Sequence, residues 1–359
     1  MEIGAPEIVR LGDDLRYRVG VRTSGTDREL WFSLSGEYAD LVSERSDAAL
    51  VALLIPAMAL GEDIVVAGTI SEKLHYTLSG PYQRVVRHII PSLRPVRIRP
   101  AEIRPAPHGA SGVATGFSGG IDSFSVLADH HYADAAPGFR LTHLFHFNVG
   151  SHGAGGARLF RERYARLKPV AERIGLPFIA VDSNVTEFYT GFNYQSTHTP
   201  RTVSAALLLQ RGIGRYLCAS SYEYASTFVG PACTMGYSEP VTLPLLSPEA
   251  LDVLCVGSEY TRVEKTLCVA GIGDSHGSLD VCVRGEAAGN CSACWKCMRT
   301  LLTLEIAGLL DRYSGVFDLR AYREGRDRYL EEVLRSDDPL LREIVAFAGA
   351  RGFALSHAT

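Results

Sequence analysis

The chain has 359 residues, 46% of them hydrophobic, and a formal net charge of −4 at pH 7. This length and composition support a large buried core and favour two domains over one, and the charge gives no global attraction to nucleic acid or acidic lipid. No basic, apolar, cleavable leader follows Met1 and no apolar run approaches the roughly 20 residues that span a bilayer, so we expect a cytoplasmic protein with no membrane partner.

Residues 1–109 are predicted to form a separate N-terminal α+β domain. Alternation of polar and apolar residues predicts an antiparallel pair of strands at its start. Prolines and glycines between 94 and 112 argue against continuous regular structure there and place a linker near 104–111. The expected elements of this domain are strands at 15–23 and 30–36, a helix from Asp47, a strand at 63–68 and a helix at 71–93.

From Val113 onward, short apolar strands alternate with longer helical segments, in a second domain of residues 110–313. This alternation predicts an α/β fold with a parallel sheet sandwiched by helices. Residues 314–359 are predicted to add amphipathic helices as a C-terminal extension. The candidate strands are 112–117, 141–149, 177–183, 215–221 and 251–257, and the candidate helices are 121–133, 157–174, 201–212 and 261–271.

The first candidate strand of the second domain runs into the hexapeptide 118–123, which reads Ser-Gly-Gly-Ile-Asp-Ser. Its glycines let the backbone approach an anion, and its N–H groups and the hydroxyls of Ser118 and Ser123 would form a phosphate cradle. Asp122 would repel phosphate unless Mg²⁺ lies between the two charges, as Mg²⁺ is typically held by carboxylates and substrate phosphates together. The alternative interpretation is an ordinary glycine turn with a helix cap.

The hexapeptide resembles the SGGxDS loop of the PP-loop ATP pyrophosphatases, the adenine nucleotide α-hydrolases that include asparagine synthetase, NAD synthetase and tRNA thiolation enzymes. The resemblance implies a doubly wound, five-stranded parallel sheet of the HUP type, ATP bound with its pyrophosphate in the loop, and cleavage between the α- and β-phosphates. It assigns magnesium to Asp122. It assigns ATP to Gly116, Phe117, Ser118, Gly119, Gly120, Ile121, Asp122, Ser123 and Asn148, and a turn residue at the end of a strand is the alternative for Asn148.

Four cysteines crowd into residues 282–297 with the spacing C-x8-C-x2-C-x2-C. Four thiolates at this spacing can close a tetrahedron about Zn²⁺, and a site with four protein ligands would stabilise the fold without activating water. A cytosolic compartment disfavours disulfides, while an iron–sulfur cluster and unmetallated thiols stay as alternatives. The predicted ligands are Cys282, Cys291, Cys294 and Cys297.

This spacing, followed by Arg299 and a helix, is similar to the carboxy-terminal signature of the 7-cyano-7-deazaguanine synthases. Those enzymes also carry the SGGxDS loop and turn a carboxylate into a nitrile with ATP and ammonia. The similarity spans roughly residues 113–310, but the N-terminal domain is extra, the loop lies far from Met1, and the family's Tyr-Pro-Asp-Cys segment is missing. We therefore expect a relative of that branch with a different substrate.

Three cations join Asp122 as catalytic candidates. Arg262, which resembles the lysine of a Leu-Thr-Lys-x-Glu stretch in that branch, and Lys265 begin a predicted helix, where either would stabilise charge on pyrophosphate. Arg201 directly follows Pro200 at the start of a predicted helix, where a Pro-x-Arg segment places an arginine in the same branch. A cation there is badly placed for the helix dipole and is expected to meet an anion. An ordinary helix surface is the alternative for Lys265, and His198 is either a base or a polar surface residue.

One locally basic stretch contains six arginines and a single acid. It predicts either an RNA-facing strip or a solvated basic face. A tRNA substrate is therefore kept as an alternative to a small molecule. The six residues are Arg84, Arg87, Arg94, Arg97, Arg99 and Arg104.

Together these features predict an ATP-dependent ligase that forms AMP and pyrophosphate. A carboxylate or amide oxygen of a small molecule attacks the α-phosphorus, and ammonia or an amine, arriving free or from a partner protein, then displaces AMP. One alternative is sulfur insertion through the same adenylated intermediate, with a sulfur donor and Cys233 as the candidate carrier; a buried structural thiol is the other interpretation of Cys233. The other is a nucleotide-binding sensor that holds ATP without turnover; a homodimer is left open.

Overall fold

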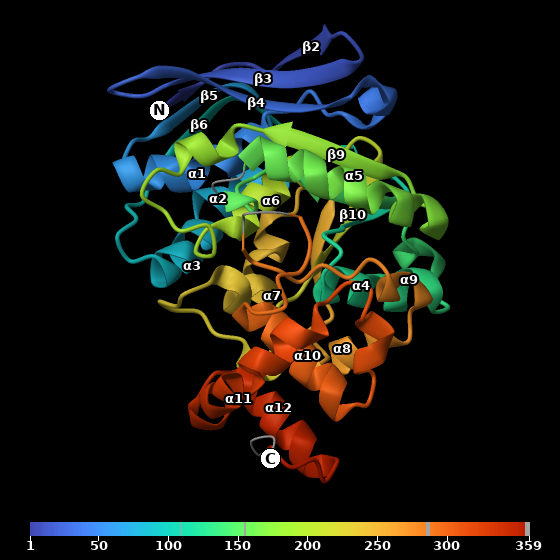
Figure 1. Cartoon of the computed structure of the whole chain (residues 1–359). Helices are drawn as coiled ribbons and strands as arrows, with labels where there is room; N and C mark the ends of the chain where they lie inside the picture. The colour runs from blue at the N-terminus through green and yellow to red at the C-terminus, as the bar shows by residue number, and fades with distance from the viewer. Residues whose placement is uncertain (108, 154–155, 285–287, 356–359) are drawn as a thin grey trace.

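The computed structural model describes residues 1–107, 109–153, 156–284 and 288–355, and within them the strands join into one 11-stranded, mostly parallel sheet (Figure 1). The predicted α/β class is thereby confirmed. The N-terminal strands lie at one end of the molecule and the last helices at the other, with the parallel strands between them (Figure 1).

Five strands after residue 110 pair in parallel, each with its neighbour. In space they follow the order β11-β10-β7-β8-β9. The order therefore reverses between β7 and β10, the first and the fourth of these strands along the chain. Their bounds are β7 Gly112–Gly116, β8 His143–Phe147, β9 Phe178–Ser183, β10 Ile213–Ala219 and β11 Asp252–Val256, and all five lie within the predicted segments or within two residues of them.

Helices cover both faces of the parallel strands. Consecutive residues of a strand point to opposite faces of the sheet, so each strand contributes side chains to both layers of helices. Val113 and Leu144 belong to one hydrophobic cluster, whereas Ala114 and Phe145, the next residues along, belong to the other. The first cluster includes residues of α4 (Ile121–Leu127), α5 (Gly156–Ile174), α8 (Arg262–Ala270) and α10 (Trp295–Ile306). The second includes residues of α1 (Asp47–Leu60) and α6 (His198–Leu207).

The N-terminal strands continue the same sheet. As predicted, β3 and β4 pair antiparallel, and β4 also pairs antiparallel with β9 through Phe32 opposite Ser183. Residues 1–109 and the parallel strands therefore share a sheet and a hydrophobic cluster, while the domain boundary at 110 stays a prediction. The elements are β1 Glu2–Ile3, β2 Glu7–Leu11, β3 Asp14–Arg22, β4 Asp27–Ser35, β5 Ile64–Ser71, β6 Ile98–Arg104, α2 Glu72–Ser79 and α3 Pro81–Ile89.

Helix α1 lies at the centre of this shared cluster. Every residue from Asp47 to Met58 is buried, as expected of a helix that is apolar all round. The carboxylate of Asp47 accepts hydrogen bonds from the Ser71 N–H at 2.8 Å and from the Gln210 side chain at 3.0 Å. These bonds connect α1 to the end of β5 and to the turn before β10.

Two predictions in the N-terminal region are wrong in detail. The proline-rich stretch was expected to lack continuous regular structure, but residues 98–104 form β6, the terminal strand of the sheet. A proline is tolerated there because its missing N–H can face the unpaired edge. The helix expected at 71–93 is two helices, α2 and α3, which meet at Gly80 before Pro81.

The C-terminal extension forms two helices, as predicted: α11 (Leu319–Arg335) and α12 (Pro339–Ala350). They contact α10, and α12 also contacts α8. None of the helices in the described ranges combines the length and the apolar character that crossing a bilayer demands.

Candidate functional site

The Ser-Gly-Gly loop lies at the carboxyl end of β7, beside the carboxyl end of β10. This is the point where the strand order reverses, and open α/β sheets bind ligands in the crevice outside such a point. Helix α4 begins at Ile121, directly after the loop, and α8 begins at Arg262 after β11. The topology therefore brings the loop and the cation-bearing helix to the same edge of the sheet.

Gly119 is the residue on which the shape of this loop depends. Its φ of +75° lies in the left-handed region, and a Cβ at this position would lie 2.8 Å from Leu167 Cδ2. Its carbonyl oxygen accepts a hydrogen bond from the Asp280 N–H at 2.7 Å. Gly120, by contrast, has an ordinary φ of −85°. The loop thus requires glycine at 119 for conformational reasons that do not apply at 120.

The serine hydroxyls of the loop brace it internally. Ser118 Oγ accepts the Gly120 N–H at 3.3 Å, and Ser123 Oγ donates to the Gly120 carbonyl oxygen at 3.0 Å. Phe117 and Ile121 are buried, at 1% and 3% exposure, so their side chains belong to the core and only their backbones can face a ligand. The assignments of Gly116 and Phe117 to adenosine stay predictions.

Asp122 lies directly against cations of α8. Its Oδ1 is 2.6 Å from Arg262 Nη1 and 3.8 Å from Lys265 Nζ. The start of α8 is fixed by a capping box, in which Thr261 Oγ1 accepts the Glu264 N–H and the Glu264 carboxylate accepts the Thr261 N–H. A cation in the first turn of a helix opposes the helix dipole, so Arg262 gains its stabilisation from Asp122.

Several cations surround the carboxylate of Asp122. Burial raises the pKa of Asp122, but the charges of Arg262, Lys265 and Lys296 outweigh burial, and the pKa lies below its usual range. Arg299, which is 5% exposed, also interacts electrostatically with Asp122. Asp122 therefore stands among four cations, while Glu343 also acts on Arg262 and Glu259 on Lys265, and an anionic ligand would meet positive charge at this position.

Lys265 is anchored within this group. Its Nζ donates to Ser220 O at 2.8 Å and to Ser220 Oγ at 2.7 Å, and the side chain is 2% exposed. Burial lowers the pKa of Lys265, and Asp122 opposes that shift. Arg262 is held in the same way, because its Nη2 donates to Ser221 O at 3.0 Å. Both cations are thus tied to the end of β10.

Lys296 and Arg299 reach the site from α10, and the sequence did not assign them to it. The scarcity of lysine could have drawn attention to Lys296, since the chain contains only Lys73, Lys168, Lys265 and Lys296. Arg299 stacks over Trp295, with its Cζ 5.1 Å from the ring centroid. The indole of Trp295 is half exposed beside these charges.

Arg201 is a buried cation without a carboxylate partner in the described parts of the chain. It is 2% exposed, its Cζ lies 3.9 Å from the ring centroid of Tyr189, and its Nε has no hydrogen-bond partner there. Burial lowers its pKa. Burying an unpaired charge is costly, so this position suits a ligand that brings an anion.

The side chains of Asn148 and His198 both form hydrogen bonds with neighbouring carboxylates. Asn148 Nδ2 donates to Asp182 Oδ1 at 2.6 Å. His198 Nε2 lies 3.0 Å from Glu239 Oε1, where the short helix α7 (Glu239–Thr242) begins. Burial lowers the pKa of His198, but the hydrogen bond and charge of Glu239, together with the hydrogen bond to the Gln195 carbonyl, raise it above its usual value. A protonated His198 suits charge pairing better than the role of a base.

The four predicted cysteine ligands come together. Their sulfur atoms all lie within 4.8 Å of one another, with Cys294 Sγ 3.5 Å from Cys297 Sγ and 4.0 Å from Cys282 Sγ. Four sulfurs at the ~2.3 Å Zn–S distance of a tetrahedral site would lie about 3.8 Å apart. The cluster, which also includes Cys291, therefore fits a structural zinc ion, which would need no further ligand.

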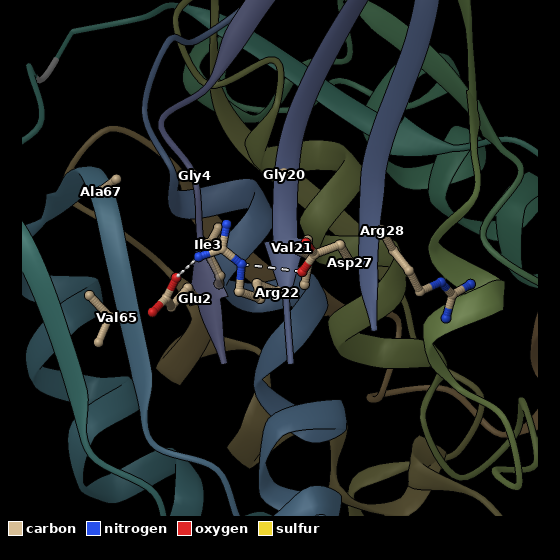
Figure 2. A pocket seen from close by; sticks show the side chains of 10 residues that line it. All are labelled: Glu2, Ile3, Gly4, Gly20, Val21, Arg22, Asp27, Arg28, Val65 and Ala67. Carbon is tan, nitrogen blue, oxygen red and sulfur yellow. Dashed lines mark hydrogen bonds and ion pairs between the residues drawn. The ribbon is translucent and has the colours of Figure 1, made fainter. Parts of the chain in front are cut away.

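A hollow of about 370 Å³ lies elsewhere, on the N-terminal sheet. Figure 2 shows Arg22 bridging Glu2 and Asp27 at its rim, at 3.0 and 3.2 Å. None of the predicted site residues lines this hollow. Its rim charges are already paired, whereas four cations gather around Asp122 beside the loop, so we place the candidate site at Asp122.

The six arginines of the basic stretch are all exposed on α3, β6 and the residues between them. Arg99 pairs with Asp63 at 3.4 Å and Arg104 with Glu102 at 2.5 Å. These contacts are those of a solvated face, and none of the six belongs to the group around Asp122.

Comparisons with known proteins add no family name. No family model matches the sequence, and no curated protein matches it. The structure itself shows a mostly parallel α/β sheet and a four-cysteine cluster that fits zinc.

Replacing Gly119 by alanine is expected to lower the free energy of unfolding by about 2–3 kcal/mol, since the left-handed backbone and the contact with Leu167 both oppose a Cβ. Gly120→Ala is the matched control and should change it by less than about 1 kcal/mol. Urea unfolding monitored by circular dichroism measures both. Equal losses in the two variants would contradict the assignment.

Replacing Cys294 by serine is expected to reduce bound zinc from about one ion per chain to a small fraction, because a tetrahedral site loses a ligand. The free energy of unfolding should fall by ~3 kcal/mol or more, a part of the ~10 kcal/mol that structural zinc can contribute. Metal analysis and urea unfolding test this, with Cys268→Ser, at an exposed cysteine, as the control. Iron, or no metal in the wild type, would contradict zinc.

Replacing Glu239 by glutamine should lower the pKa of His198 below 6.5, since burial then acts without the opposing charge. In the wild type the raised pKa makes the pair stabilising below pH 6.5, and this contribution is lost as the pH rises through the folded-state pKa. The stability difference between wild type and variant should therefore shrink with rising pH. Histidine NMR titration and urea unfolding measure this, with Glu172→Gln, an exposed position, as the control; an unchanged His198 pKa would contradict it.

Proposed function

We propose that the protein is an ATP pyrophosphatase-type ligase, which adenylates a carboxylate or amide oxygen of a small molecule and replaces it with a nitrogen nucleophile. The observation that carries this proposal is the convergence at one sheet edge of the Gly119 loop, Asp122 and the cations Arg262 and Lys265. Buried cations beside the backbone N–H groups of a loop that precedes a helix suit a departing pyrophosphate.

The strand order supports the same proposal. Numbered along the chain, the five parallel strands lie in the order 3-2-1-4-5, which matches the first five strands of a doubly wound nucleotide-binding sheet. The loop at the end of the first strand is where such a sheet receives phosphate. A HUP-type arrangement and membership of the PP-loop superfamily, closest to the 7-cyano-7-deazaguanine synthase branch, are the finer parts of the proposal.

In the proposed first step, a substrate carboxylate oxygen attacks the α-phosphorus of ATP. A new O–P bond forms, the bond from the α-phosphorus to the bridging oxygen breaks, and pyrophosphate leaves with that electron pair. The Gly119 loop would receive it, with Arg262 and Lys265 offsetting its charge. Asp122 would contribute a carboxylate oxygen to Mg²⁺, which would neutralise phosphate charge when bound.

In the second step, ammonia or an amine attacks the acyl carbon, loses a proton, and AMP leaves as the C–O bond to it breaks. Arg201 suits the role of a substrate contact, because a bound carboxylate or phosphate would supply the partner that its guanidinium lacks. A small, anionic substrate is therefore favoured over tRNA for this site.

Sulfur insertion is the second candidate. Cys233 is exposed, so its thiol is accessible to a donor and would be able to carry sulfur to the adenylated carbon. A nucleotide sensor is the third, from another class, and it would leave unexplained why an acid stands among cations at the phosphate loop.

The test is incubation with ATP, Mg²⁺ and pooled metabolites or tRNA. The wild type should release pyrophosphate and AMP in equal amounts, and Asp122→Asn should reduce the rate at least about a hundredfold with an unchanged unfolding curve. Asp134→Asn, at a fully exposed aspartate, is the matched control. Release of ADP and phosphate, or full activity of Asp122→Asn, would refute the proposal.

The donor is identified in the same assay. Dependence on ammonium with a product one water lighter than the sum of substrate and ammonia indicates amidation. Dependence on sulfide, with sulfur replacing oxygen in the product as sulfide attacks the adenylated carbon and AMP leaves, indicates sulfur insertion. ATP binding without any pyrophosphate indicates the sensor.

A further inference from the structure

Asp280 connects the cysteine cluster to the Gly119 loop. It follows the short helix α9 (Gly273–His276) and precedes Cys282 by two residues. Its side chain is 6% exposed. No motif in the sequence singles it out, and it belongs to neither the cysteine ligands nor the charges around Asp122.

The backbone of Asp280 holds the loop. Its N–H donates to the Gly119 carbonyl oxygen at 2.7 Å. Its own carbonyl oxygen lies 3.4 Å from the position that a Cβ of Gly120 would occupy. The Asp280 peptide thus runs along both glycines and supports the left-handed turn at Gly119.

The carboxylate of Asp280 holds the cysteine segment. Oδ1 accepts from the Cys282 N–H at 3.3 Å, and Oδ2 accepts from the Gly289 N–H at 3.2 Å. Oδ2 also pairs with Arg166 Nη1 of α5 at 2.9 Å. A buried carboxylate with three donors has one well-defined position, so a movement of Cys282 is transmitted to the Asp280 peptide and from there to Gly119.

We propose that Asp280 is a positioning residue through which metal occupancy of the cysteine cluster sets the shape of the Gly119 loop. The inference rests on the proposed function only in giving that loop a nucleotide to bind. A metal held by Cys282 would fix the segment that Asp280 braces. Because Cys294 and Cys297 flank the start of α10, the same metal would also fix Lys296 and Arg299 beside Asp122.

The test compares Asp280→Asn with Asp274→Asn. Asp274 is a matched control, since it also pairs with an α5 arginine, Arg173, at 3.4 Å, but does not contact the loop. Arg166→Gln, which removes only the ion pair, is a second variant should Asp280→Asn fail to fold. The measurements are bound zinc, amide hydrogen exchange at 118–123, and affinity for an ATP analogue with a methylene bridge between the α- and β-phosphates, with Mg²⁺.

We expect Asp280→Asn to exchange the loop amides at least about tenfold faster than wild type and to bind the analogue about tenfold more weakly. Zinc-stripped wild type should show the same faster exchange, and Asp274→Asn should stay within about twofold of wild type. Unchanged exchange in Asp280→Asn or after zinc removal would overturn the inference. If wild type binds no analogue, the proposed function fails, while the exchange data still decide the role of Asp280.

Discussion

The site depends on one carboxylate, Asp122, placed among cations at the reversal of strand order. The reversal sets β7 beside β10, so that the loop after one strand and Ser220 after the other lie at the same edge. Arg262 and Lys265 are both tied to the end of β10 and both approach Asp122. Charges this close are costly to bury without balance, and the cations gathered around Asp122 favour an anionic ligand.

The N-terminal region packs against elements that carry candidate site residues. None of the charged groups described around Asp122 comes from it. Strand β4 extends the sheet beyond β9, and α1 packs on α6, the helix that carries Arg201. Tyr189, which stacks on Arg201, donates its hydroxyl to Ala52 O of α1 at 2.9 Å. Residues 1–109 therefore help to fix the packing around the buried guanidinium of Arg201.

The parallel strands and their helices were predictable because each is a short apolar run followed by a helical period, a local pattern. Strand β6 was not, since Pro100 is a valid signal against a strand and only its place at the sheet edge overrides it. The cysteine cluster was readable from spacing alone. The sequence could not identify three further site residues, Lys296, Arg299 and Asp280. Each is a single charged residue in α10 or after α9, and its role depends on contacts with segments more than a hundred residues away.

The pair between Asp122 and Arg262 bears on how a nucleotide would enter. Without ligand, the 2.6 Å contact neutralises both groups, and taking Asp122 away would leave Arg262, whose side chain is 8% exposed, charged and poorly solvated. A free triphosphate would attract Arg262 and leave Asp122 facing phosphate, whereas a free divalent cation would attract Asp122 and leave Arg262 unpaired beside Lys265. A magnesium–nucleotide complex carries both complementary charges, so the pair can exchange partners in one event. Under the proposed function, the site therefore favours that complex over either component alone.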